Sequence, residues 1–209
     1  MTTSPRRGRL PRRERDARRA EILSVAAAEL VDVGTHGLTM ASVARRAGAS
    51  KETLYAWFGG RDELLGAVIE ANADESMAAI SELLDREGPD DLNRVREVLR
   101  SLATGLLTLL TSRVSIELNR TAATSPALAT LLLASGRHRV GPRVEAFLAE
   151  LHSRGILTVP DPAAAFRTFY GLTIRDTQIR VLLGEPAPGA DEIAATADQA
   201  VEYFLILSR

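Results

Sequence analysis

The chain has 209 residues, with 26 Lys and Arg against 27 Asp and Glu, and therefore a formal net charge of −1. It contains no cysteine, which excludes disulfides, zinc–thiolate sites and a cysteine nucleophile. No apolar run approaches the length of a membrane span, and the Arg-rich N-terminus lacks the apolar stretch of a signal peptide, so we expect a cytoplasmic protein without membrane contact.

The charges are distributed unevenly along the chain. Residues 1–61 carry twelve Lys or Arg against six acids, whereas the remainder carries fourteen against twenty-one. A basic N-terminal part followed by an acidic remainder is typical of a protein that binds DNA through one part only. The alternative is a charged, solvated surface without a partner.

Residues 1–13 are rich in Arg, Pro, Gly and Ser and show no apolar periodicity, which predicts a disordered basic arm. Such an arm could reach DNA phosphates or a minor groove, or could serve only as a solubilising tail. Its arginines are Arg6, Arg7, Arg9, Arg12 and Arg13. A first helix is expected at about 15–33, with Gly34 at its end and a connector at 35–37.

Residues 39–61, TMASVARRAGASKETLYAWFGGR, contain two short helical patterns separated by a tight turn. Thr39 is a suitable N-cap for the first helix, and Ser50 for the second. Gly48 suits the left-handed position that ends a helix. A helix, a glycine turn and a second helix form the arrangement that places the second helix in the DNA major groove.

The second of these helices has an apolar side. Leu54 and Phe58 are four residues apart and point inward together. The same spacing also occurs in an ordinary helical hairpin, with Tyr55 and Trp57 as core aromatics, so spacing alone leaves both interpretations open.

From residue 61 onward the chain shows only helical patterns, so an all-α fold is predicted. Helices are expected at about 61–84, 91–112, 114–124, 127–153, 162–183 and 191–207. The longest of them contains Gly136, Gly141 and Pro142, which could kink or divide it.

The segments EILSVAAAELVDVGTHGLTMASVA and ARRAGASKETLYAWFGGRDELL closely resemble the N-terminal domain of the TetR (tetracycline-repressor) family over about residues 18–68. The resemblance implies a three-helix helix-turn-helix head at 14–60 and a helical ligand-binding and dimerisation domain at 61–209. It implies a transcriptional regulator, usually a homodimeric repressor that binds a palindromic operator in double-stranded DNA and is released by a small-molecule effector. The residues in register are Gly34, Gly37, Thr39, Ala44, Gly48, Ser50, Leu54, Tyr55 and Phe58.

The resemblance also suggests which side chains meet DNA. Two fall where the family contacts phosphates through a hydroxyl, Thr39 and Tyr55, and three fall where it reads base edges, Lys51, Glu52 and Thr53. Arg61 falls where the family holds a phosphate, and the Trp57 indole can donate to a phosphate or simply pack. Because Glu52 is acidic, it must meet a cytosine amine, pair with a base such as Lys51, or turn away. The full candidate set is Thr39, Met40, Ser50, Lys51, Glu52, Thr53, Tyr55, Trp57 and Arg61.

An effector pocket is expected inside the bundle formed by residues 90–183. Few aromatic residues and many leucines favour an apolar ligand. Each polar candidate could equally belong to a solvated helix face. These candidates are Arg113, Glu117, Asn119, Arg120, His138 and Arg175.

The last two predicted helices carry broad apolar stripes. The resemblance implies that they form a four-helix interface with a second copy, whereas the residues alone also fit an intramolecular core. The candidate interface residues are Phe166, Tyr170, Thr173, Thr177, Val181, Ile193, Ala197, Val201 and Phe204.

Two other functions are alternatives. A nucleoid-type protein that binds DNA without sequence preference would share the basic arm but would not need the second domain. An all-α enzyme would need a general base among His36, His138, His152 or a carboxylate. The sequence has no HExxH, no metal-ligand spacing and no glycine-rich phosphate loop, so we assign no catalytic residue, metal or cofactor.

Overall fold

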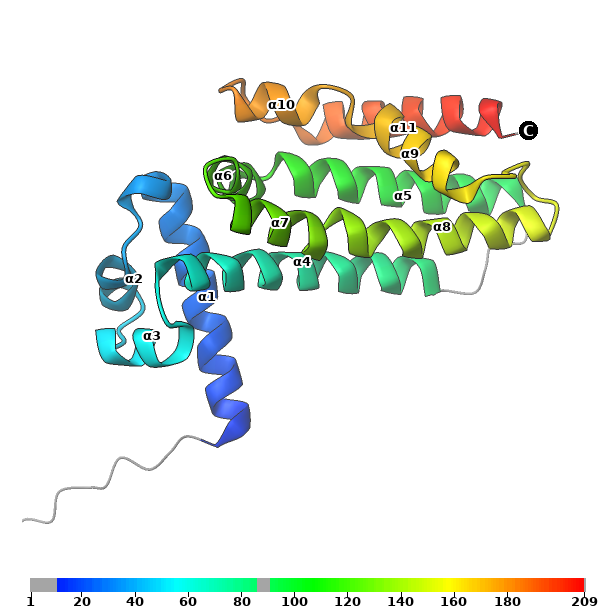
Figure 1. Cartoon of the computed structure of the whole chain (residues 1–209). Coiled ribbons are helices and arrows are strands. Elements are labelled where there is room, and N and C mark those ends of the chain that lie inside the picture. The colour runs from blue at the N-terminus through cyan, green and yellow to red at the C-terminus, as the bar shows by residue number, and fades with distance from the viewer. Residues whose placement is uncertain (1–10, 86–90, 209) are drawn as a thin grey trace, which may run out of the picture. The chain divides into compact units, whose positions relative to one another are not determined.

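The structure is a computed structural model that describes residues 11–85 and 91–208. Within these ranges the regular structure is helical, which confirms the predicted all-α class (Figure 1). The chain divides into two compact units, Met1–Val68 and Ile69–Arg209, and the boundary falls inside helix α4 (Arg61–Asp85). None of the helices in the described ranges combines the length and the apolar character that crossing a membrane requires.

The first unit contains α1 (Arg12–Gly37), α2 (Met40–Arg46), α3 (Lys51–Phe58) and the beginning of α4. Helix α1 begins directly after Pro11, so the expectation that Arg12 and Arg13 belong to a disordered arm is wrong. Proline before a helix is compatible with helical residues immediately after it, and arginine is a good helix former. The remaining arginines of the predicted arm lie outside the described residues.

Two glycines break the helices of this unit. Gly34 has φ 68° and ψ 178° and interrupts α1 where the sequence predicted its end. Gly48, with φ 59°, follows α2 in the left-handed conformation that was predicted for it. Both conformations are unfavourable for residues with a Cβ atom, and these glycines therefore set the direction in which the chain enters α2 and α3.

The core of the first unit is built from one face of each helix. The side chains of Ile22, Leu30, Val43, Leu54 and Leu64 are fully buried and come from all four helices. Burying one face of α2 and α3 leaves the opposite face in solvent. The core thus decides which residues of the helix-turn-helix are available to a partner.

The second unit contains the rest of α4 and seven further described helices. Figure 1 shows α5, α8 and α11 as long helices running lengthwise through this unit, and α11 packs along α5 and α9. Fully buried side chains such as Leu99, Val144 and Phe169 join their apolar faces in a continuous core. The seven helices are α5 (Leu92–Thr111), α6 (Arg113–Ala122), α7 (Pro126–Ser135), α8 (Arg137–Ser153), α9 (Pro162–Ile174), α10 (Thr177–Leu182) and α11 (Ala190–Leu207).

Two of the helices predicted for this unit are divided in the structure. The predicted helix 127–153 is divided at Gly136, between α7 and α8, and continues without an end through Gly141 and Pro142. The prediction of a single helix at 162–183 is wrong, because α9 ends at Ile174 and α10 begins at Thr177.

The break between α9 and α10 is centred on Arg175, which has φ 48°. Two residues before it, the Thr173 hydroxyl donates to the Phe169 carbonyl at 2.8 Å, a kind of contact that often bends helices. The Arg175 guanidinium then donates to the carbonyl of Leu172 at 3.3 Å and to Oε1 of Gln199 on α11 at 2.7 Å. These contacts stabilise a backbone conformation that is unusual for a residue other than glycine.

Candidate nucleic-acid interface

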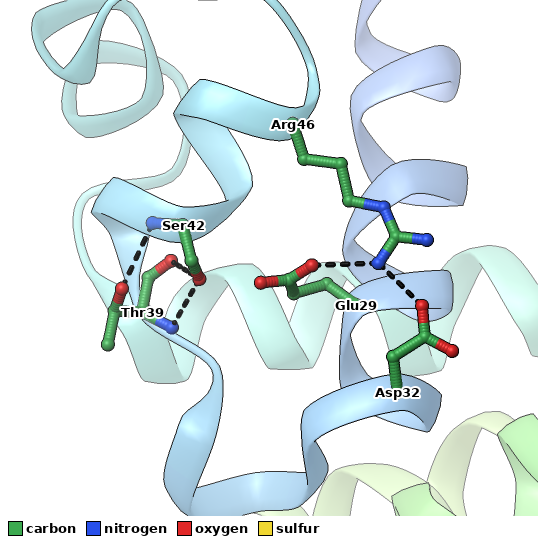
Figure 2. Close-up of polar contacts among 5 residues, drawn as sticks. All are labelled: Glu29, Asp32, Thr39, Ser42 and Arg46. Atoms are coloured by element: carbon green, nitrogen blue, oxygen red, sulfur yellow. Dashed lines mark hydrogen bonds and ion pairs between the residues drawn. The ribbon is translucent and has the colours of Figure 1, made fainter.

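Side-chain caps fix where α2 and α3 begin. Thr39 Oγ1 accepts from the Ser42 amide at 3.0 Å, and the Thr39 amide donates to Ser42 Oγ at 3.1 Å, a reciprocal capping box (Figure 2). Ser50 Oγ accepts from the Thr53 amide at 3.1 Å and caps α3. Both caps that the sequence predicted are confirmed.

A charged cluster fastens α2 to α1. Arg46 Nη1 donates to Glu29 Oε2 at 2.8 Å and to Asp32 Oδ2 at 2.7 Å, as Figure 2 shows. The Glu29 side chain is 10% exposed and that of Arg46 39%, so water reaches this contact from the Arg46 side only. The hydrogen bond from Arg46 is the main reason why the pKa of Glu29 lies below its ordinary value.

Two arginines of α1 contact the helix-turn-helix from its inner side. Arg18 Nη2 donates to the carbonyl of Ala47, just before the turn, at 2.5 Å. Arg19 lies with its Cζ 5.2 Å from the centroid of the Phe58 ring of α3. Sequence reasoning missed both roles, because the partners are separated by about thirty residues or more and no local pattern links them.

Helix α3 presents a polar face to solvent. Ser50, Lys51, Glu52 and Tyr55 are exposed, and the Tyr55 side chain is unusually so for an aromatic residue, at 53%. Thr53 is half-buried, with Oγ1 3.0 Å from Ser50 Oγ. The structure therefore brings most of the predicted DNA-contact residues to one helix and its N-cap.

Glu52 keeps its charge on this face. Its pKa lies below the ordinary value, mainly because the carboxylate accepts a hydrogen bond from its own backbone amide, with smaller effects of Ser50 and Lys51. A carboxylate in the first turn of a helix is favoured by the helix dipole. An ionised acceptor is consequently present on the exposed side of α3 at neutral pH.

Two of the nine candidates are engaged within the first unit itself. Met40 is 5% exposed, because its side chain packs in the core of the first unit. Arg61 donates through Nε to the Leu38 carbonyl at 3.0 Å and through Nη2 to the Thr35 carbonyl, so its guanidinium holds the connector between α1 and α2. Trp57 is half-buried on α3. Arg61 thus has a structural role within the first unit, and its contact with a DNA phosphate stays a prediction.

The second unit contains a cavity of about 210 Å³ between α4, α5, α6, α7, α8, α9 and α10. Leucine is the commonest residue in its walls, and Ile69, Val140 and Phe166 add to their apolar part. Of the six polar candidates, Asn119 lines the cavity. Sequence reasoning missed Arg137 and Gln178 as lining residues and assigned Tyr170 to an interface.

The other five polar candidates lie elsewhere. Glu117 pairs with Arg120, whose Nη2 also donates to the Leu182 carbonyl at 2.8 Å and joins α6 to the end of α10. Arg113 and His138 are exposed, and Arg175 stabilises the break after α9. None of the five lines this cavity, because helix periodicity does not show which polar residues face a cavity, and contact with an effector stays a prediction for them.

The predicted interface residues are largely internal. Five of them are buried in the core of their own chain, where the Phe169 and Phe204 rings pack edge to face at 5.3 Å. These five, which are corrected from interface to core, are Phe166, Thr173, Ala197, Val201 and Phe204. Four are partly exposed: Tyr170, Thr177, Val181 and Ile193. Other apolar side chains of these helices are exposed instead, namely Ile179, Leu183, Tyr203, Ile206 and Leu207.

Both units match known families of regulators. Residues 22–68 match the family described as bacterial regulatory proteins, tetR family, and residues 97–207 match the AefR-like transcriptional repressor, C-terminal domain. The crystal structure of a TetR transcriptional regulator from Agrobacterium tumefaciens is 35% identical, with a TM-score of 0.76 over 91% of this chain and 94% of that chain.

Two further proteins extend the comparison. The HTH-type transcriptional activator FasR of Mycolicibacterium smegmatis is 37% identical over 97 residues, which are 46% of this chain and less than half, 42%, of FasR. The transcriptional regulator FadR from Bacillus subtilis, solved in complex with stearoyl-CoA, has the same fold at 16% identity, with a TM-score of 0.69 over 88% of this chain and 96% of that chain. These relatives are transcriptional regulators and not enzymes.

Proposed function

The chain belongs to the TetR family of DNA-binding transcriptional regulators, and from this premise we propose that it acts as a homodimeric repressor. In this proposal two copies bind the two half-sites of a palindromic operator, and a small molecule releases them from the DNA.

The observation that carries the proposal is the polar face of α3. This helix is capped at Ser50, anchored by the buried Leu54 and Phe58, and exposes Lys51, Glu52 and Tyr55. Anchored on one side and polar on the other, it has the form of a helix that enters a major groove. One such helix reads few base pairs, so two half-sites are needed for useful specificity.

The roles on this face follow from the chemistry of each side chain. The hydroxyls of Tyr55 and Thr39 donate to phosphates. The Thr39 oxygen accepts the hydrogen bond that caps α2, and its O–H can still donate. Lys51 contacts guanine or a phosphate, and the ionised Glu52 accepts from a cytosine amine. Ser50, Thr53 and Trp57 lie beside them and complete the contact set.

The exposed apolar residues of α10 and α11 support a dimer. Leu183, at the end of α10, is 79% exposed and is the most exposed of the large apolar side chains in the described residues. With Ile179, Tyr203, Ile206 and Leu207 it forms the surface that we assign to the second copy. Burying these side chains in an interface would remove them from water and stabilise the pair of chains.

Release by a ligand is a population shift in this proposal. The cavity of the second unit binds the effector, and the liganded chain favours a conformation of the dimer that no longer fits two successive major grooves. The stearoyl-CoA bound by FadR supports the view that this fold accommodates small molecules.

Selection of bound sequences from random duplex DNA tests the proposal. An enriched palindrome with half-sites about one helical turn apart is expected. Tight, salt-sensitive binding without an enriched sequence would favour the nucleoid-type alternative and contradict the proposal. Transcription from a promoter carrying the selected sequence separates repression from the activation that the name of FasR describes.

A further inference from the structure

The cavity of the second unit has mostly apolar walls, and the charge among its lining residues is positive. Among the described residues that line it there is no Asp or Glu, whereas Arg137 contributes a guanidinium. Arg137 is exposed, so this charge lies where the cavity meets solvent. A ligand with one anionic group and an apolar body would match both features.

Arg137 is held in place but not neutralised. Its Cζ lies 4.4 Å from the centroid of the Tyr170 ring, a cation–π contact that leaves the N–H groups at the edge of the guanidinium available. The neighbouring arginines of α8 are committed, since Arg139 pairs with Asp74 at 2.6 Å and Arg143 pairs with a carboxylate at the end of α4. For Arg137 no such acidic partner occurs in the described ranges.

The beginning of α8 adds to this positive region. The helix begins at Arg137, and its N-cap, Gly136, lines the cavity and provides no side-chain cap. Side chains cap α5, α7 and α9 at Asp91, Ser125 and Asp161, whereas α10 and α11, like α8, have no side-chain cap. Uncapped amides at a helix N-terminus carry partial positive charge and favour an anion. The N-terminus of α8 and the Arg137 guanidinium therefore both favour an anionic group at the same end of the cavity.

Tyr170 provides a neutral donor beside Arg137. Burial raises the pKa of its hydroxyl, against the opposing effects of the Arg137 charge and of a hydrogen bond from Arg137, so the hydroxyl stays protonated at neutral pH and keeps its own proton to donate. Two other polar groups of the wall are already used, because the Ser76 hydroxyl donates to the Asn72 carbonyl and the Asn119 amide to the Ser115 carbonyl, each at 2.8 Å. The side chains of Asn72 and Gln178 also line the cavity, but they are uncharged and cannot balance an anion as Arg137 can. We accordingly assign Arg137 and Tyr170 as the donors to a ligand.

The volume limits the size of that ligand. The cavity of about 210 Å³ is smaller than the roughly 300–1,000 Å³ of sites for drug-sized molecules. An apolar cavity of about 150 Å³ suffices for benzene. The remaining space fits a short acidic group, and the edge-to-face pair of Phe166 and Tyr170, with centroids 6.0 Å apart, offers an aromatic wall for a ring.

We propose that the cavity binds a one-ring organic carboxylate, with its ring between the leucines and Phe166 and its carboxylate at Arg137, Tyr170 and the first turn of α8. The inference rests on the proposed function, because it names the chemical class of the effector.

Calorimetric titration of the full chain with benzoate and phenylacetate tests the assignment, with benzamide and phenylacetamide as neutral analogues of matched shape. The carboxylates are expected to bind at least tenfold more tightly than the amides. Arg137→Gln should weaken carboxylate binding at least tenfold, and Tyr170→Phe less strongly. Arg139→Gln is the matched control, since Arg139 pairs with Asp74 and does not line the cavity, and it should bind as the wild type does.

Equal binding of carboxylates and amides, no binding of either carboxylate, or an unchanged affinity in Arg137→Gln would overturn the assignment. Operator affinity is measured in parallel to keep the two proposals separate. Binding of the carboxylates without any change in operator affinity would leave the site intact and contradict ligand release. Release by a long-chain acyl compound, with no binding of a one-ring carboxylate, would support ligand release and overturn this assignment.

Discussion

At the scale of single residues, the charged side chains of the first unit separate into those that hold the fold and those that are free to meet DNA. Arg46, Arg18 and Arg61 donate to groups within the unit. Lys51 and Glu52 are exposed on α3. Substitutions in the first group should change stability, and substitutions in the second should change DNA binding.

The Glu29–Arg46 contact predicts a pH-dependent stability. Because the pKa of Glu29 is lowered in the folded chain, the contact stabilises the fold above the ordinary pKa of a glutamate and loses this effect as the pH falls. Glu29→Gln should lower the free energy of unfolding by about 1.5–3 kcal/mol near neutral pH, the range for hydrogen bonds to charged groups. The difference from the wild type should shrink below about pH 4.

Urea denaturation at a series of pH values measures this difference. Asp32→Asn is the control, since Asp32 bonds the same guanidinium atom but has a side chain that is 50% exposed, and it should have a smaller effect. A difference between Glu29→Gln and the wild type that stays constant with pH would show that the carboxylate charge is not what stabilises the contact.

The exposed face of α3 predicts separable effects on DNA binding. Lys51→Ala should weaken operator binding and reduce the slope of log affinity against log salt by about one, because one cation fewer displaces counterions. Tyr55→Phe should weaken binding without changing the slope, because the lost donor is neutral. Binding assays at several salt concentrations provide both values.

Arg94→Ala serves as the control for these variants, since Arg94 is an exposed cation of the second unit that pairs with Glu97. It should leave both the affinity and the slope unchanged. If Lys51→Ala and Tyr55→Phe both bind the operator as tightly as the wild type does, the assignment of α3 to the major groove is contradicted.

Local residue roles could be predicted and non-local ones could not. The caps at Thr39 and Ser50 depend on amides three residues away, so the sequence alone identifies them. The role of Arg61 depends on the carbonyls of Thr35 and Leu38, which the break at Gly34 brings within reach. A motif position therefore suggested a phosphate contact for a side chain that the fold uses internally.

At the scale of elements, α11 has one face in the core and one in solvent. Phe204 is fully buried against Phe169, whereas Ile206 is exposed two residues later. Phe204→Ala should lower the free energy of unfolding by about 3–5 kcal/mol, as truncation of a core aromatic does. Thermal or denaturant unfolding at fixed chain concentration measures this loss, and an effect below 1 kcal/mol would contradict the core assignment.

Ile206→Glu tests the other face of α11. A charge on a surface that contacts a second copy should weaken the dimer, while the fold of the chain, measured by circular dichroism, stays intact. Sedimentation equilibrium of the variant and the wild type gives the dissociation constant. Asp191→Asn, an exposed polar change at the other end of the same helix, is the control. An unchanged dimer in Ile206→Glu would exclude this face as the interface.

The helix breaks show what a one-dimensional pattern contains. Gly136 identified the division between α7 and α8 because glycine is a poor helix former. The break at Arg175 has no such signal, since arginine is a good helix former and its conformation is stabilised by Gln199 on a different helix. The apolar stripes predicted the existence of α9 and α11 but not whether their residues face the chain's own core or a second copy.

At the scale of the whole molecule, the two units carry different features of the proposed regulator. The first is basic and presents α3, and the second is acidic and contains the cavity and the exposed apolar surface of α10 and α11. The central claim is that two copies act together and place two α3 helices on one operator.

The spacing of the operator half-sites tests this claim most directly. Affinity is measured for the selected palindrome and for the same palindrome with about five extra base pairs, half a helical turn, between its half-sites. The insertion turns the half-sites to opposite sides of the DNA, so a dimer that needs both should lose at least tenfold in affinity. Equal affinity for the two DNAs would contradict the dimeric reading of the operator.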